Sequence, residues 1–266
     1  MKRIFVCILI SGLGLLSWSQ AAKEGKIPVT TASKAALGFY NEAIKWFDKV
    51  DLNKGREQLI KALYEDPDFF MANYQMSLYF SWNGNFEKFD EYAGIAENCK
   101  AGLSQAEELL KSAISRLRDN PEGDVTEVGK KLVEMYPGDI NAYNHLMYFQ
   151  SFINDVQGQL ETITRALKID GNQPSLYNQL GYVYMSLKQN DKAEAAFDKY
   201  IELDPKNPNV YDSKGDYFLN NKEYLKAYES YMKAYRIDSA WGYEKAQKAK
   251  QLYEMTEGKS LQIVPV

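Results

Sequence analysis

The sequence predicts an all-α fold in which helix pairs repeat along the chain. One observation is an opening pattern that returns every 34 residues, in which a tyrosine is followed by leucine or glycine at fixed offsets, at Tyr143, Tyr177 and Tyr211. A second is a closing segment with the same spacing, at residues 166–171, 200–205 and 234–239. A fixed period of this length is typical of stacked helical repeats, in which each unit buries its apolar face only against its neighbours.

Length and composition agree with one continuous array. The chain has 266 residues, of which 45% are hydrophobic and 26% charged, so length alone allows one large domain or two smaller ones. The repeat favours a single elongated array. The net charge is -4 and the pI about 5.3, and no run of basic residues occurs, so we expect no nucleic-acid partner.

The first residues differ in composition from the rest. Lys2 and Arg3 precede an apolar stretch at residues 4–16, and small residues follow at 17–22. This order is typical of a secretory signal peptide, which we expect over residues 1–21, and the apolar stretch is too short for an ordinary membrane span. The alternative is a membrane anchor that is retained.

Removal of the signal peptide would leave the mature chain with one cysteine. Cys7 lies inside the apolar stretch, which disfavours a lipoprotein, and Cys99 is the other cysteine. A mature chain with one cysteine has no internal disulfide, so stacked helices would have to provide the stability. We expect residues 22–35 to form a linker and no segment after signal cleavage to span a membrane.

The clearest units show why two antiparallel helices can pack closely. Gly181 and Gly215 are small residues of the predicted first helices. In the second helices, Phe197 and Tyr231 each lie four residues after an alanine, which places both side chains on one helical face. Pro205, in the closing segment, stops a second helix because proline cannot continue it.

These positions resemble the tetratricopeptide repeat family. Its pattern of aromatic, Leu-Gly, aromatic, Ala, aromatic, Ala and Pro is matched, closely over residues 140–241, by Tyr177, Leu180, Gly181, Tyr184, Ala193, Phe197 and Pro205. Tyr200 departs from the pattern, because the family usually has a small residue there. The resemblance implies a right-handed superhelix, or solenoid, of about six antiparallel helix pairs that acts as a scaffold for protein–protein interaction.

Weaker matches extend the array in both directions. We expect repeats near residues 36–69, 70–103, 106–139, 140–173, 174–207 and 208–241, a capping helix at 242–255 and a tail at 256–266. A two-residue insertion near position 104 keeps the register. The third unit is the least regular, because Asn120–Asp124 makes a longer turn and Gly129 stands where an aromatic is expected. In the cap, Ala246 and Ala249 lie on the apolar face.

The sequence contains no arrangement of residues typical of catalysis. His145 is the one histidine, and its position between Asn144 and Leu146 indicates a structural or groove-lining side chain. Cys99 is expected to be a partly buried small side chain. No phosphate-binding loop and no zinc-type cluster occurs, so we expect no enzyme, no cofactor and no metal.

The resemblance implies which residues line the concave groove. In this family the groove is lined by the first helices, at fixed positions around the opening aromatic. The corresponding residues here are Asn141, Asn144, Tyr148, Ser175, Asn178, Tyr182, Asn209, Asp212 and Asp216. Asparagine offers donors and an acceptor to an extended peptide backbone, and tyrosine offers a flat apolar surface.

The charges at these positions restrict the partner. The family's clamp for a C-terminal carboxylate uses Lys and Arg, whereas this chain has Asn, Tyr and Asp, so recognition of an acidic chain end is not expected. Asp212 and Asp216 favour a protein or peptide partner that is neutral or basic. In the first two units Tyr40 and Tyr74 correspond to Asn144 and Asn178.

The predicted function is binding of an extended peptide segment or a partner protein in the groove. We expect an exported protein that is periplasmic or envelope-associated in a bacterium. The alternative is a structural or assembly subunit of a cell-envelope complex that uses the convex face and the edges of the array.

Overall fold

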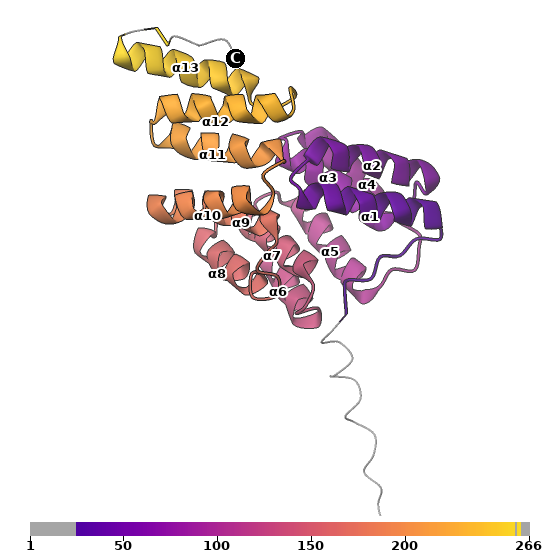
Figure 1. Cartoon of the computed structure of the whole chain (residues 1–266). Helices are drawn as coiled ribbons and strands as arrows, with labels where there is room; N and C mark the ends of the chain where they lie inside the picture. Colours follow the sequence, from indigo (N-terminus) through magenta and orange to yellow (C-terminus); the bar gives the residue numbers. More distant parts are fainter. Residues whose placement is uncertain (1–24, 259, 262–266) are drawn as a thin grey trace, which may run out of the picture.

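The computed structural model describes residues 25–258, 260 and 261, which form thirteen α-helices and no strand, so the prediction of an all-α helical-repeat fold is confirmed (Figure 1). The expected signal peptide and part of the expected tail lie outside the described residues. The helices are α1 Lys34–Asp48, α2 Leu52–Glu65, α3 Phe70–Trp82, α4 Phe86–Glu97, α5 Gln105–Asp119, α6 Thr126–Met135, α7 Ile140–Phe152, α8 Val156–Ala166, α9 Pro174–Ser186, α10 Asn190–Leu203, α11 Pro208–Asn220, α12 Tyr224–Ile237 and α13 Tyr243–Glu257.

The turn inside most helix pairs uses one residue with left-handed backbone geometry. The residues concerned have φ values of 52° to 70°, and they are Val50, Gly84, Asn154, Lys188 and Lys222. They occupy the same position in pairs one, two, four, five and six. In the third pair the C-cap residue one position earlier, Asn120, is extended, with φ at -144°, whereas the C-caps of the other five first helices have φ between -79° and -96°, so the chain leaves α5 in a different direction.

A glycine and an aromatic ring set the spacing of the helices in the fifth and sixth pairs, as the sequence predicts. A Cβ atom added at Gly181 would lie 2.5 Å from Cζ of Phe197, and one added at Gly215 would lie 2.5 Å from Cδ1 of Tyr231. Both rings are fully buried. Because neither glycine has a side chain, the ring of Phe197 on α10 packs directly on the backbone of α9, and the ring of Tyr231 on α12 packs directly on the backbone of α11.

In the fourth, fifth and sixth units the opening tyrosine holds the first helix against the loop before it. The hydroxyl groups of Tyr143, Tyr177 and Tyr211 each donate to a backbone carbonyl six residues earlier, at O···O distances of 3.0–3.2 Å. In the second pair Asn73 takes the same position, and its side-chain amide donates to the carbonyl of Pro67 at 3.0 Å. The loop carbonyls are thus satisfied by side chains in four units.

The two helices of the third unit, α5 and α6, do not pack closely on each other. Few residues of α5 contact α6, and α6 packs mainly on α7. Gly129 of α6 faces the backbone of α7 so closely that an added Cβ would lie 2.7 Å from Cα of Leu146. Glycine at this position therefore replaces the expected aromatic because the next helix occupies the space.

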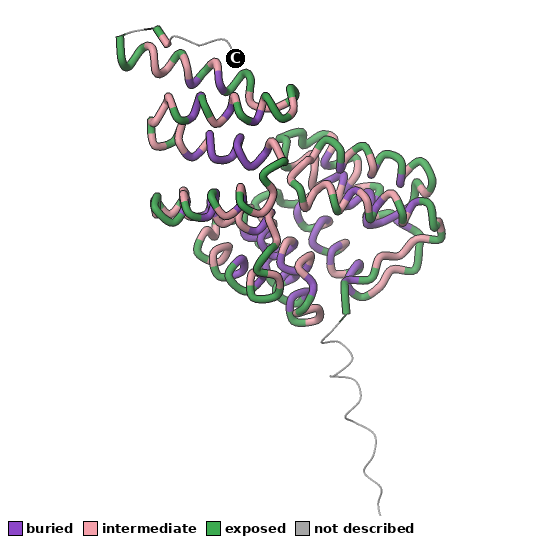
Figure 2. The backbone as a smooth tube through the Cα atoms, viewed as in Figure 1, coloured by how far each residue is buried: buried purple, intermediate pink, exposed green. Residues whose placement is uncertain are grey.

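The array is curled rather than elongated, which differs from the expectation. The Tyr74 hydroxyl on α3 lies 3.2 Å from Nδ1 of His145 on α7, so first helices two units apart touch directly. One hydrophobic core extends from Ile27 to Val183, whereas α10–α13 carry smaller separate clusters. Figure 2 shows buried backbone in the lobe that holds α3 and α7 and a further buried run along α11.

The residues expected to form a linker are instead bound along the lobe. Residues 25–33 are not helical and run beside the starts of later helices. The Ile27 amide donates to Asp139 at 2.8 Å, and the amide and hydroxyl of Thr30 donate to the two carboxylate oxygens of the fully buried Glu107 at 2.7 Å each. This segment, which we call the strap, joins the first unit to the third and fourth.

The last helix covers the sixth unit. Ala246 and Ala249 of α13 are fully buried against Tyr228 and Tyr231 of α12, on the apolar face that the sequence indicates. A helix with a polar outer face is the usual end of a repeat array. Among the described helices, none is long and apolar enough to cross a bilayer.

The glycine contact predicts opposite outcomes for two alanine substitutions. Gly181→Ala forces the ring of Phe197 to move and should lower the free energy of unfolding by about 1–3 kcal/mol. Gly38→Ala is the matched control, because Gly38 lies within α1 with no atom near its Cβ position, and should raise stability by about 0.5–1 kcal/mol. Urea unfolding of the three chains measures both changes, and equal midpoints would contradict the packing account.

Candidate functional site

The nine residues predicted to line a groove lie on three first helices. Asn141, Asn144 and Tyr148 are on α7, Ser175, Asn178 and Tyr182 on α9, and Asn209, Asp212 and Asp216 on α11. Tyr182 is exposed, four are half-buried, and Ser175, Asn178, Asn209 and Asp212 are buried. The structure therefore places the α11 residues in a satisfied network and leaves groups on α7 and α9 without partners.

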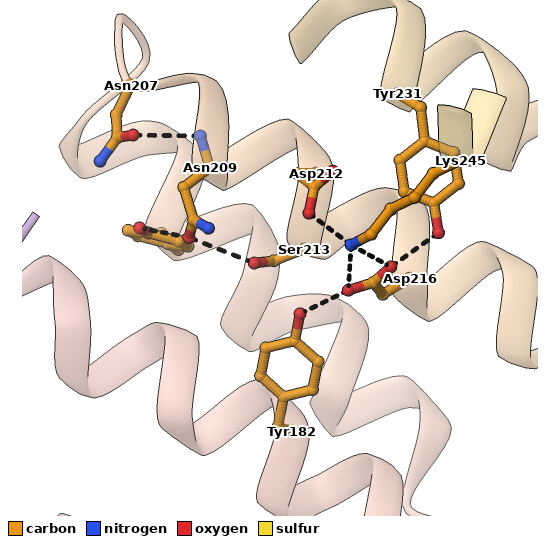
Figure 3. A network of polar contacts seen from close by, with 9 residues as sticks. Tyr182, Asn207, Asn209, Asp212, Ser213, Asp216, Tyr231 and Lys245 are labelled. Atoms are coloured by element: carbon orange, nitrogen blue, oxygen red, sulfur yellow. Dashed lines mark hydrogen bonds and ion pairs between the residues drawn. The ribbon is translucent and has the colours of Figure 1, made fainter. Parts of the chain in front are cut away.

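A lysine from the capping helix neutralises part of the acidic end of this surface. Nζ of Lys245 on α13 lies 2.6 Å from Oδ2 of Asp212 and 2.9 Å from Oδ1 of Asp216 (Figure 3). Burial opposes the charge of Lys245, but the two carboxylates outweigh it and raise the pKa of the ammonium group. Burial also raises the pKa of Asp212, although Lys245 acts in the other direction.

Two tyrosines complete the contacts of Asp216. The Tyr182 hydroxyl donates to Oδ2 at 2.8 Å, and the Tyr231 hydroxyl donates to Oδ1 at 2.7 Å (Figure 3). Burial first, and the neighbouring carboxylate next, raise the pKa of both phenols well above the ordinary value. Both remain neutral donors at physiological pH, so Asp216 links α9, α12 and α13 at the inner face of α11.

Asn209 is held by the residue that departs from the family pattern. The Tyr200 hydroxyl donates to Oδ1 of Asn209 at 2.9 Å, and Tyr200 is fully buried. The Ser213 hydroxyl reaches the same oxygen at 3.3 Å (Figure 3). The acceptor of Asn209 is therefore used inside the protein, because the large side chain at position 200 reaches it.

The groups on α7 and α9 are different. Of the four buried side-chain atoms without a hydrogen-bond partner in the described part of the chain, three belong to predicted groove residues: Oδ1 of Asn144, Oδ1 of Asn178 and the hydroxyl of Tyr148. The Tyr148 hydroxyl lies near Ser81 of α3 without a hydrogen bond of ordinary geometry, and burial raises its pKa. Unpaired buried acceptors are unfavourable, so these atoms are suited to a donor that comes from outside.

The two tyrosines at the equivalent positions of the first units do not line a surface. Tyr40 packs on Phe69 with ring centroids 5.3 Å apart, and Tyr74 packs on His145 at 5.4 Å. Both are buried. The inward curl of α3 onto α7 fills the place where the inner surface of these units would lie.

His145 and Cys99 have structural environments. His145 is 5% exposed, and burial lowers its pKa from 6.5 to about 4, so the ring is neutral at physiological pH. The Cys99 thiol donates to the carbonyl of Asp68 at 3.1 Å, and burial raises its pKa. Burial denies the neutral His145 ring the access that a general base needs, and the raised pKa of Cys99 disfavours the thiolate that a nucleophile needs.

Sequence reasoning missed one recess and one residue. An apolar recess of about 270 Å³ lies between α3, α4, α5 and α7, and its lining includes Phe86, Leu117 and Phe152. It depends on the separation of α5 from α6, which no repeat position predicts.

Lys245 follows Tyr211 by 34 residues, so a register continued into the cap would have drawn attention to it. In the described residues no group of three or more His, Cys, Asp or Glu side chains could hold a metal ion.

Comparisons with known proteins support the resemblance over part of the chain. Residues 174–207 and 208–240, which hold the fifth and sixth helix pairs, match the family model described as Tetratricopeptide repeat. These two segments are therefore assigned to the tetratricopeptide repeat (TPR) family. No curated protein is similar enough in sequence to match the chain.

Several solved structures are similar to the chain at low identity. One is TTC0263, a thermophilic TPR protein in Thermus thermophilus, with 14% identity over 82% of this chain and 99% of its own, and a TM-score of 0.42. YrrB, described as a TPR protein with an unusual peptide-binding site, has 16% identity over 81% and 92%, with a TM-score of 0.38. A chain of the APC/C hetero-tetramer Cut9–Hcn1 has 16% identity over 80% of this chain and 42% of its own, with a TM-score of 0.46.

The buried histidine predicts a pH dependence of stability. The unfolded chain protonates His145 near pH 6.5 and the folded chain near pH 4, so stability falls as pH falls between these values, by about 3 kcal/mol in all. Asp48 acts in the opposite sense: burial raises its pKa from 3.8 to about 6, although Lys26 counteracts this, so it adds stability as pH falls through that range. His145→Gln retains the Asp48 contribution. Urea unfolding from pH 7 to 4 should show the stability gap between wild type and variant shrinking, whereas a constant gap would contradict the assignment.

The ion pair of the cap predicts a local loss of stability. Lys245→Met leaves the buried Asp212 uncompensated and should lower the free energy of unfolding by about 1–2 kcal/mol, with faster hydrogen exchange in α13. Adding Asp212→Asn should restore part of the loss because it removes the unpaired charge. Lys248→Met, on the exposed face of the same helix, is the control and should change little.

Proposed function

We propose that this chain is a non-enzymatic interaction scaffold that binds an extended peptide segment, or an extended part of a partner protein, along the inner faces of α7, α9 and α11. The single observation that carries the proposal is the pair of unpaired amide oxygens at Asn144 and Asn178. These two residues are 34 positions apart and occupy the same place in successive units. TPR proteins bind peptides or proteins, and the assigned segments form two of the three helices concerned.

The chemistry of the free atoms defines the binding mode. Amide oxygens accept hydrogen bonds, so they would meet backbone N–H groups or side-chain donors of the partner. An extended segment presents N–H groups at regular intervals whatever its sequence. Tyr182, which is exposed beside this row, would contribute flat apolar contact.

The charge of the partner follows from the network on α11. Lys245 balances one of the two carboxylates, so Asp212, Asp216 and Lys245 together leave one negative charge. This supports a neutral to basic partner near α11, with a smaller preference than two free aspartates would give. The binding helices are held by their pairs before a ligand arrives, so little of the scaffold would need to be ordered on binding.

The proposal includes the location of the protein. The basic start, the apolar stretch and the small residues of positions 1–22 support export, with the mature chain periplasmic or envelope-associated in a bacterium. A partner would then be another envelope protein or a segment of one.

A second candidate function is that of an assembly subunit that uses its edges and convex face. The observation that favours it is the apolar recess beside α4, which is lined by Phe86, a side chain that is 63% exposed. Trp82, at the end of α3, is 69% exposed. Exposed apolar side chains around a recess are typical of contact surfaces. A short extended peptide should compete with a partner bound in the groove and should not displace one bound at this recess.

The groove proposal is tested by removing the two unpaired acceptors. A peptide selected on the wild-type chain from a random-sequence phage library should bind Asn144→Ala/Asn178→Ala about tenfold or more weakly, measured by isothermal titration calorimetry. Stability should not fall, since neither oxygen has a partner to lose.

The matched control removes two asparagines from exposed positions. Asn172→Ala/Asn220→Ala has the same chemical change outside the row and should bind the peptide like wild type. Equal affinity of wild type and the Asn144/Asn178 variant would overturn the groove proposal.

A further inference from the structure

The turn between α1 and α2 contacts the loop between α10 and α11, although these units are not neighbours in the array. The carbonyl of Lys49, between α1 and α2, accepts a hydrogen bond from Nδ2 of Asn207, between α10 and α11, at 2.7 Å. These residues are 158 positions apart in sequence. Beside them Val50 packs against a cluster of the C-terminal units that contains Tyr200, Val210 and Tyr211. Figure 1 shows the start of α11 beside the N-terminal lobe.

Val50 is also the residue least suited to its backbone geometry. Its φ is 59°, in the left-handed region, which is unfavourable for a β-branched residue. The equivalent turns use Gly84, Asn154, Lys188 and Lys222, none of which is β-branched. A strained residue persists where its surroundings hold it, and here the surroundings include the cluster of the fifth and sixth units.

Lys54 at the start of α2 is electrostatically influenced by the sixth unit. Its pKa is raised, mainly through its hydrogen bond to Asp51, and Asp238 at the end of α12 makes a smaller contribution. We define the arm as α10–α13, whose hydrophobic clusters are separate from the main core.

We infer that the Lys49–Val50 turn is a latch that closes the array onto its own C-terminal arm, and that release of this latch opens the groove to its partner. The inference rests on the proposed function and adds its regulation. With the latch closed, Asn178 is 7% exposed and its oxygen has no partner. The closed state therefore leaves the Asn178 oxygen without a partner, and a partner bound to the open state would supply its donor.

The test uses two substitutions that weaken the latch. Val50→Asn removes the apolar contact and gives the turn a residue that the fourth unit already uses there, Asn154. Asn207→Asp keeps the oxygen that caps α11 through the Asn209 amide but loses the donor to Lys49 and the donor to Oδ2 of Asp204, which lies 3.2 Å from the same nitrogen. Asp204→Asn/Asn207→Asp is therefore measured beside it, because it removes the repulsion between the two carboxylates. Each variant should show a larger radius of gyration by small-angle X-ray scattering and should bind the selected peptide about two- to tenfold more tightly.

Matched controls make the same changes away from the latch. Lys188→Asn alters the equivalent turn of the fifth pair, and Asn85→Asp alters an N-cap whose side-chain oxygen accepts from Lys88. Both should match wild type in scattering and in affinity. Circular dichroism melts verify that every variant is folded.

The possible failures are separable. Scattering of the free chains needs no ligand, so an unchanged radius in Val50→Asn and Asn207→Asp overturns the latch whatever the groove does. A larger radius with unchanged affinity overturns the link between latch and groove. Failure of the groove itself is read from the Asn144/Asn178 variant, which leaves the latch intact.

Discussion

The close approach of two helices at a glycine is the contact on which the rest of this structure depends. Tyr231 shows why, because its ring lies on Gly215 while its hydroxyl donates to Asp216 on the inner face. Phe197 lies in the same way on Gly181, and the ring of Tyr182 meets it edge-on at 5.3 Å. The packing of each pair thus fixes the positions of the polar groups on its first helix, and a change of side-chain volume in the core would move the inner surface.

The third unit determines the overall shape by departing from the repeat. The chain is extended at Asn120, where other units turn, and Gly129 admits the backbone of α7. The result is a lobe in which Tyr74 meets His145 across the inner side. A repeat array normally adds small, similar rotations from unit to unit, so one irregular unit is enough to change its course. The inner surface is consequently filled at the N-terminal end.

The sequence was sufficient to predict the helix pairs and their packing residues, because these follow from local periodicity and from contacts within one unit. It could not predict the curl, which depends on the direction of a single turn. The strap was also beyond reach, since Ile27 and Thr30 use backbone amides to reach carboxylates 112 and 77 residues away. For the site, the register identified the right helices, but it could not show that the Tyr200 hydroxyl satisfies Asn209 or that the Lys245 ammonium group satisfies Asp212.

The predicted inner-surface residues are therefore of two kinds: those whose polar groups have partners within the protein and those whose polar groups have none. On α11 the preceding unit, the partner helix α12 and the cap supply donors and a cation, so the polar groups there stabilise the end of the array. On α7 and α9 no described residue of the protein provides a donor to Asn144 or Asn178, although both oxygens are buried. A buried acceptor without a partner is unfavourable in the free protein and becomes favourable when a donor arrives. The middle of the array, rather than its acidic end, is therefore where binding would gain most from hydrogen bonds.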